Sequence, residues 1–234
     1  MSPRARISLA IFLLLGAALC VRLGFWQLSR LDQRKAMNAR AAAQRTAPEQ
    51  PILAVTGNRD NRRVRATGTF DRAYEVVLRG QVHDGSPGVH VVTPLRLAGS
   101  DSAVLVNRGF VPAADAMTAN LDALGEPGPV TVTGIALSIG ATRDGGQPLE
   151  RNGATTWRQL DLEALRQRTP YPLLDVVIIR EPGPDSSAFP RPVPPPDLSN
   201  GPHLNYAIQW FAFATIAVVG GVILLRKKRE RAAP

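Results

Sequence analysis

Two long apolar segments, one near each end of the chain, limit what this sequence can fold into. The first covers residues 7–28 and the second covers residues 203–225. A helix rises ~1.5 Å per residue, so about 20 apolar residues cross the ~30 Å hydrocarbon core of a bilayer. The segment between them has mixed polarity and no comparable apolar run. The sequence therefore predicts a membrane protein with two transmembrane helices that flank one domain, residues 29–202.

The net charge of +9 is concentrated beside the apolar segments. Basic residues crowd the first 45 residues and the tail 226–234, whereas the middle of the chain is close to neutral. A basic face for DNA or RNA is therefore not expected. The cations that follow Leu225 predict a cytoplasmic C-terminus, because cytoplasmic flanks carry an excess of Lys and Arg.

With two spans, residues 1–6 are then also cytoplasmic, and the domain lies on the periplasmic face of the inner membrane. Arg22, Arg30, Arg34 and Lys35, on the outer side of the first span, argue mildly against this orientation.

The first apolar segment has a competing interpretation as a cleaved signal peptide. Its apolar stretch is longer than the usual h-region of about 7–15 residues, and no A-x-A cleavage site follows. We therefore expect a retained anchor. Cys20, the only cysteine, lies within this span and is expected to be a packing residue. Without a second cysteine, thiol redox chemistry and copper delivery by a cysteine pair lack their ligands.

The central segment is rich in β-branched residues separated by Gly, Pro and Asp. Asp161 is expected to cap a short helix that ends at Arg168, and residues 28–46 to form a helix that leaves the membrane. A loop is expected at 47–61, a surface loop at 141–148 and a Pro-rich linker at 182–202. The expected strands are Val64–Phe70, Glu75–Val82, Val89–Leu97, Ala103–Val111, Val130–Leu137, Thr155–Leu160 and Leu174–Arg180, with a hairpin turn at His83–Gly88. The predicted fold class is α+β, with one mainly antiparallel β domain that forms a small barrel or sandwich.

The motifs of common enzyme classes are missing from the sequence. There is no G-x-S-x-G elbow and no phosphate-binding glycine loop. His83, Asp84 and Ser86 are too close together in one turn to align as a catalytic triad. His83 and His90 could meet across the hairpin, but two imidazoles make an incomplete metal site. We therefore predict no enzymatic activity and no metal site of this kind.

His203 opens the second apolar segment, and Tyr206 and Trp210 follow at positions i+3 and i+7 on one helix face. One interpretation is an interfacial belt, in which Tyr and Trp lie at headgroup depth. The other is a haem site with His203 as axial ligand and the aromatic rings against the porphyrin.

Five blocks of the sequence resemble motifs of the surfeit locus protein one family, in the family's order. Departures are small: Phe110 stands where Trp is usual, and Gln209 where Thr is common. The blocks are Arg22–Leu28 with Arg30 (G-x-W-Q-x-x-R), Arg63–Asp71 (R-V-x-x-x-G-x-F), Gly88–Leu95 (G-x-x-V-x-T-P-L), Val104–Pro112 (L-V-N-R-G-W-V-P) and His203–Phe211 (H-x-x-Y-A-x-x-W-F).

The resemblance implies a non-enzymatic assembly factor for haem-copper cytochrome c oxidase. It implies haem a as a transient cofactor, with His203 as candidate ligand beside Tyr206 and Trp210. The implied partners are the membrane, the core subunit of the oxidase and the haem a synthesis machinery. Arg22, Arg30 or Arg34 could neutralise haem propionates, although membrane headgroups are the simpler partners.

Two other roles stay open. The protein could be a scaffold that steadies the oxidase core subunit without holding haem. It could also be an unrelated membrane-tethered periplasmic protein. Within the domain, Gly68 and Gly109 are expected to allow bends or close backbone approach.

Overall fold

The computed structural model describes residues 3–140, 148–151, 154–183 and 189–230. It separates into two compact units, one made of residues 1–40 with 198–234 and the other of residues 41–197. Most of the surface loop predicted at 141–148, the first two residues of the chain and residues 231–234 of the basic tail lie outside the described residues.

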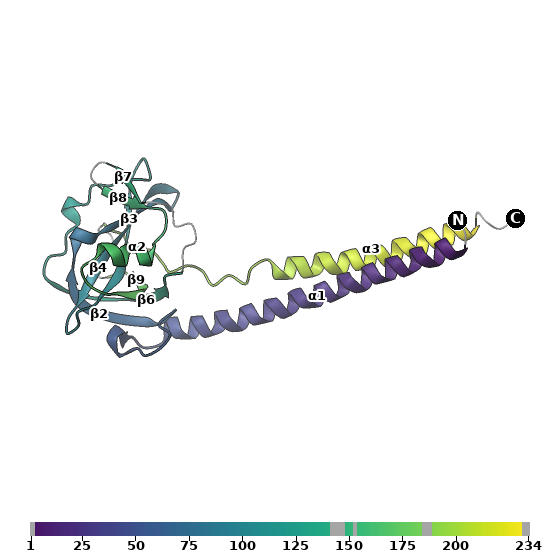
Figure 1. Ribbon diagram of the computed structural model, residues 1–234, viewed down its shortest axis with the longest axis horizontal. Helices are drawn as coiled ribbons and strands as arrows, with labels where there is room; N and C mark the ends of the chain where they lie inside the picture. Colours follow the sequence, from purple (N-terminus) through teal and green to yellow (C-terminus); the bar gives the residue numbers. More distant parts are fainter. Residues whose placement is uncertain (1–2, 141–147, 152–153, 184–188, 231–234) are drawn as a thin grey trace. The chain divides into compact units, whose positions relative to one another are not determined.

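Two long helices form the first unit, and both are long and apolar enough to cross a membrane. Helix α1 runs from Pro3 to Thr46, and α3 runs from His203 to Glu230. They lie antiparallel and side by side, so that Pro3 and Glu230 are at the same end of the pair (Figure 1). The sidedness of the two predicted spans and their boundaries at 7–28 and 203–225 stay predictions.

Small residues line the contact between the two helices. Ala17 of α1 and Ala207 and Ala214 of α3 are buried. A Cβ on Gly24 would lie 2.6 Å from the ring of Phe211, and one on Gly221 would lie 2.9 Å from Leu13. Small side chains let helix backbones approach closely in a membrane, where apolar burial alone drives little association. The half-buried Cys20 also lies in α1.

The second unit is a closed β-barrel with a strand extension. The barrel strands follow one another in the order β2-β6-β9-β5-β4, and β4 pairs with β2 to close it. Its neighbouring strands are antiparallel except for β5 and β9. Strands β3, β8 and β7 extend the sheet from β4, and β1 is added to β2. The strands are β1 (Gln50–Pro51), β2 (Arg63–Phe70), β3 (Val76–His83), β4 (Ser86–Leu97), β5 (Ala103–Pro112), β6 (Pro129–Ser138), β7 (Leu149–Arg151), β8 (Ala154–Trp157) and β9 (Leu173–Arg180).

Gly68 allows the barrel to close. Strands β2 and β4 pair over only three positions, beginning with Gly68 opposite Leu97. A Cβ on Gly68 would overlap the carbonyl oxygen of Arg96. The close backbone approach predicted for this glycine is therefore confirmed.

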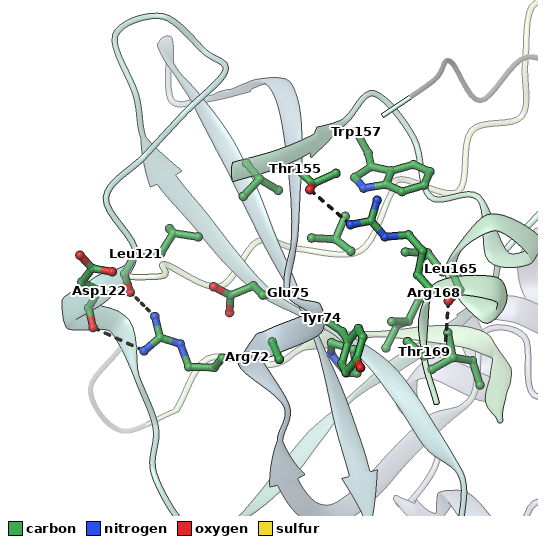
Figure 2. A pocket seen from close by; sticks show the side chains of 16 residues that line it. Arg72, Tyr74, Glu75, Leu121, Asp122, Thr155, Trp157, Leu165, Arg168 and Thr169 are labelled. Carbon is green, nitrogen blue, oxygen red and sulfur yellow. Dashed lines mark hydrogen bonds between the residues drawn. The ribbon is translucent and has the colours of Figure 1, made fainter. Parts of the chain in front are cut away.

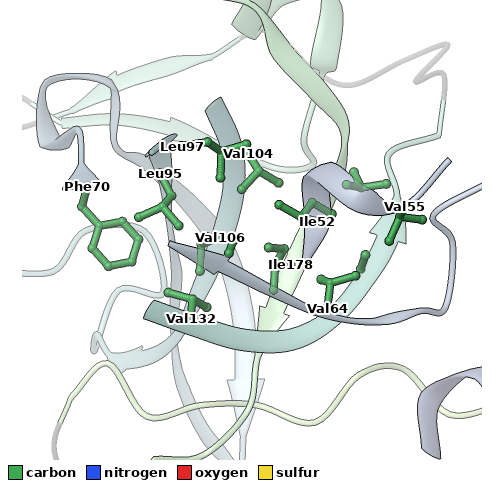
Figure 3. Close-up of a cluster of buried hydrophobic side chains, with 13 residues drawn as sticks. Ile52, Val55, Val64, Phe70, Leu95, Leu97, Val104, Val106, Val132 and Ile178 are labelled. Carbon is green, nitrogen blue, oxygen red and sulfur yellow. The ribbon is translucent and has the colours of Figure 1, made fainter. Parts of the chain in front are cut away.

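The barrel interior is filled by apolar side chains from all five strands and from the 3₁₀ turn η1 (Ile52–Ala54). In β2, buried and exposed residues alternate, which is the pattern of a strand with one face in the core. Figure 3 shows this cluster: Ile52, Val55, Val64, Ala66, Phe70, Leu95, Leu97, Val104, Val106, Val132, Ala136, Val176 and Ile178.

A second cluster covers the outer face of the barrel under helix α2 (Leu162–Arg168). Asp161 caps this helix as predicted, because its side chain accepts a hydrogen bond from the Ala164 amide. Leu165 packs with Trp157 and Leu173 in this cluster. Strand β5 is buried on both faces because it lies between the two clusters.

Three segments differ from the sequence-based expectation. The strand expected at Thr155–Leu160 ends at Trp157, before a bend that leads into α2. The loop expected at 47–61 contains β1 and η1. Within the linker expected at 182–202, Arg191 forms a two-way backbone bridge with Phe110 on β5, so this part of the linker is fixed to the barrel.

Candidate functional site

His203 is the first residue of α3 and contacts α1 through its ring. Its Nδ1 lies 2.9 Å from Oε1 of Gln27. An amide oxygen can only accept a hydrogen bond, so Nδ1 carries the proton in this arrangement. In the neutral ring with this tautomer, the lone pair is on the other nitrogen, Nε2. A second hydrogen bond of this kind fixes the orientation of many metal-binding histidines.

A cavity of ≈ 350 Å³ lies beside His203 in the helix-pair unit. Arg30 and Arg34 line it from α1, and Gly201 lines it from the turn that precedes α3. Arg34 Nε donates to the carbonyl oxygen of Ser199 (3.1 Å), and Arg30 Nη1 donates to Gln33 (3.0 Å). A guanidinium has five N–H groups, so both arginines keep donors for an anionic group. The cavity combines an imidazole acceptor with two cations.

The two aromatic residues predicted beside His203 have different environments. Trp210 is half-buried, and its ring meets Phe213 edge-on at 6.0 Å between centroids. Tyr206 is exposed, and within the described residues no hydrogen bond or ring contact joins it to His203. The three residues share a helix face by spacing, but the structure does not bring them into one contact cluster. Their role stays a prediction.

Gln27 is a site residue that the sequence analysis did not single out. It belongs to the G-x-W-Q-x-x-R block, and its partner His203 belongs to the H-x-x-Y-A-x-x-W-F block, 176 residues away. The two blocks therefore meet at one hydrogen bond, which pairing the two motifs could have suggested.

Arg108 is a second residue whose environment was not foreseen. Its side chain is only 1% exposed and forms ion pairs with Glu75 (3.1 Å) and Glu126 (3.0 Å). It also donates to the carbonyl oxygen of Leu124 and lies 5.2 Å from the ring centroid of Phe70.

Glu126 connects Arg108 to a second cation, Arg180, at 2.7 Å. Burial alone would raise the pKa of Glu126, but the two arginines together lower it. The ion-pair network therefore holds this carboxyl in its charged form.

Gly109 follows Arg108 at a bulge in β5. It has φ +133°, and a Cβ there would overlap the carbonyl group of Arg191. The predicted close approach at Gly109 is therefore confirmed.

The residues considered for catalysis or metal binding lie around the β3–β4 hairpin. His83 Nε2 is 3.5 Å from an oxygen of Asp84, and Ser86 is exposed. His83 and His90 both contact the ring of Phe110. Across the described ranges, no group of three or more His, Cys, Asp or Glu residues is placed to hold a metal ion.

Burial, with a smaller contribution from His83, lowers the pKa of His90 to about 4. His90 is therefore neutral at physiological pH. The hairpin predicted here is confirmed, but its turn is shorter than the predicted 83–88. It consists of Asp84 and Gly85, both at positive φ, because β3 ends at His83 and β4 begins at Ser86.

Along the sequence, the closed β-barrel follows one long apolar helix and precedes another. A histidine and two arginines lie where the second helix begins. These features define a membrane-anchored β-barrel protein. The sequence profile of the SURF1 family matches residues 14–215. The chain belongs to the SURF1 family.

Relatives cover most of the chain. A SURF1-like protein of Monosiga brevicollis is 29% identical over 226 residues, which is 89% of this chain and 84% of the relative. A SURF1-like protein of Rickettsia felis is 28% identical over 92% of this chain and 96% of its own length. Surfeit locus protein 1 of Mus musculus is 30% identical over 43% of this chain and 39% of its own length.

Proposed function

We propose that this protein is an assembly factor for haem-copper cytochrome c oxidase that assists the insertion of haem a into the core subunit. Family membership supports the general role. The observation that carries the haem proposal is the hydrogen bond between His203 and Gln27, because it leaves Nε2 as an electron-pair donor beside two arginines.

The residue types around His203 suit the iron and the propionates of a haem group, although the cavity of ≈ 350 Å³ would not enclose the porphyrin. A neutral imidazole with a fixed orientation is a common axial ligand, and arginines suit carboxylates such as haem propionates. His203 would ligate the iron, Arg30 and Arg34 would pair with the propionates, and Tyr206 and Trp210 would offer aromatic contacts. The haem would be cargo for the oxidase, so no redox or bond-breaking step by this chain is required.

A carrier must release what it holds. One axial imidazole gives weaker attachment than two, which suits transfer to a partner. Two membrane spans would keep an apolar cofactor at the bilayer and so prevent its exposure to water. We place the protein in the inner membrane with both termini in the cytoplasm and the β-barrel in the periplasm. Its partners would be the oxidase core subunit and the haem a synthesis machinery.

The experiment is an absorption spectrum of the protein purified from membranes of a host that makes haem a. The wild type is expected to show an a-type haem spectrum, and His203→Ala is expected to lose it. Gln27→Leu should retain the ligand but reduce the haem content, because the imidazole loses its orienting bond; second-shell losses of this kind typically cost about 10–100-fold in metal affinity. The matched control is His83→Ala, which removes a histidine outside this site and should leave the spectrum unchanged.

Retention of haem by His203→Ala would contradict the proposed ligand. If the wild-type protein never carries haem, although the oxidase of the host depends on this protein, the result would instead favour the scaffold role.

A further inference from the structure

A cavity in the β-barrel unit is independent of the His203 site. Its volume is ≈ 280 Å³, and it lies between the start of β3, the segment at residues 121–122, and α2. Figure 2 shows Glu75 projecting from the start of β3 toward the 121–122 segment, with Trp157 and Arg168 on another side of the cavity. Nothing in the proposed haem role uses this cavity.

One carboxylate oxygen of Glu75 is available to a ligand. Its side chain is 9% exposed and lines the cavity. Oε2 accepts hydrogen bonds from Thr93 (2.6 Å) and Arg108 (3.1 Å). Oε1 accepts none from any residue that the structure describes. A carboxylate oxygen can only accept, so a ligand that meets Oε1 must offer an N–H or O–H group.

The charges around the cavity favour a ligand that also carries an anion. Arg108 lies directly behind Glu75, so a simple cation would gain little there. Arg72 donates to the carbonyl oxygens of Leu121 and Asp122 (2.6 and 3.4 Å). Because these acceptors are uncharged, Arg72 also leaves a positive charge and further donors at the cavity. Arg168 makes only a 3.3 Å hydrogen bond to Thr155 and a 5.9 Å contact with the Trp157 ring. Its guanidinium has no acidic partner within the described residues and can donate hydrogen bonds to a carboxylate.

The space is small, and its remaining wall is partly apolar. Leu105, Trp157, Leu165 and Leu173 form the apolar part, and Asp122, Thr155 and Thr169 also line the cavity. Cavities that hold drug-sized ligands measure about 300–1,000 Å³, so this one suits a ligand of amino-acid size and is too small to enclose a porphyrin.

We propose that this cavity binds a small carboxylate that also carries an N–H or O–H donor, such as an amino or hydroxy acid. The same chemistry occurs in a free molecule and in the C-terminal residue of a peptide. Arg168 pairs with the carboxylate, Oε1 of Glu75 accepts from the donor, and an apolar side chain packs against Trp157 and Leu165.

The test is isothermal titration calorimetry on the full chain in lipid nanodiscs with three probes. N-acetyl-L-leucine represents a peptide C-terminus, L-leucine represents a free amino acid, and N-acetyl-L-leucinamide has no carboxylate. At least one of the two carboxylates is expected to bind saturably. The one that binds more tightly shows whether the natural ligand is a free acid or the C-terminus of a peptide. The amide should bind at least about tenfold more weakly, because it loses a charge-assisted bond.

Three variants locate the site, each checked first for an unchanged unfolding temperature. Arg168→Gln should weaken carboxylate binding about tenfold. Ala73→Trp places a large ring in the cavity lining and should block binding without changing any charge. The matched control Arg158→Gln removes the same charge from an exposed residue outside this cavity and should bind as the wild type does. The proposal is overturned if no probe saturates below about 10 mM, if the amide binds as well as the acid, or if Arg168→Gln and Ala73→Trp both bind normally.

Discussion

Arg108 carries a full charge into the wall of the barrel, where Glu75 and Glu126 neutralise it. A buried ion pair of this kind adds little net stability, because desolvation of the charges offsets their attraction. Its loss is costly, however, because the remaining charges stay buried without a partner. The network also joins the segment around Leu124 to β5, so it fixes a loop as well as a charge.

Replacement of Arg108 by Met should therefore destabilise the β-barrel by about 3–5 kcal/mol, the usual cost of removing one partner of a buried pair. Chemical unfolding in detergent micelles, followed by circular dichroism, measures the change. Arg65→Met is the matched control, because Arg65 is half exposed and lies 3.7 Å from Glu49. It should change the free energy of unfolding by no more than about 0.5 kcal/mol. Equal effects of the two substitutions would contradict the structural role of Arg108.

His90 gives the barrel a dependence on pH. Its pKa is lowered to about 4 in the fold, mainly by burial, from 6.5 for a free side chain. The unfolded chain therefore binds a proton between these values while the folded chain does not. Stability should fall as the pH drops from about 6.5 to about 4, by about 1–2 kcal/mol when partial solvent exposure is allowed for.

The unfolding temperature of the wild type at pH 7 and pH 5 tests this expectation. His90→Gln keeps a polar side chain next to Asn107 and should show a smaller difference between the two pH values. An equal difference in wild type and variant would assign the pH dependence to other groups.

At the residue scale, the sequence was informative where a residue type and its position already restrict the chemistry. His203 and its helix position could be singled out in this way. Gln27 could be found only by pairing its motif with the motif of His203, 176 residues away. Arg108 could not be singled out, because its ion-pair partners Glu75 and Glu126 lie in other segments of the chain. A buried arginine is recognised only when the residues around it are known.

Among the elements, the contact between α1 and α3 depends on small residues at regular intervals. Gly24 lies under the ring of Phe211, and Phe211 also meets Phe25 edge-on at 5.4 Å. Gly16, in the same helix, has no atom within 4 Å of the position that a Cβ would take. The two glycines therefore offer a matched pair for testing the helix contact.

Gly24→Val should push the helices apart and lower the amount of folded protein in the membrane, whereas Gly16→Val should not. Overpacking of this kind typically costs about 1–3 kcal/mol. Adding Phe211→Ala to Gly24→Val should restore part of the loss, because it removes the ring that the new side chain meets. The measurement is the amount of monodisperse protein recovered after extraction and heating. Equal losses for the two single variants would show that α1 and α3 do not pack through Gly24.

Most strands were predicted from runs of β-branched residues separated by Gly, Pro and Asp, and each barrel strand buries side chains in the barrel interior. The short strands β7 and β1 were not predicted, because they have three and two residues, too few to show a sequence pattern. The strand expected at Thr155–Leu160 was too long, because its last residues turn toward the cap of α2.

For the molecule as a whole, the two apolar ends of the sequence were enough to predict two membrane helices around a β domain. The choice between a barrel and a sandwich could not be made from the sequence. That choice depends on whether β2 pairs with β4, which is a contact between strands that are not consecutive. The same holds for the bridge between Arg191 and Phe110, in a segment whose composition suggested only a linker.

The most direct test of the proposed role is a reduced-minus-oxidised spectrum of host membranes with and without this gene. The deletion strain should lose most of the a-type haem signal, the wild-type gene should restore it, and His203→Ala should not. An unchanged a-type signal and unchanged oxidase activity in the deletion strain would contradict a role in oxidase assembly.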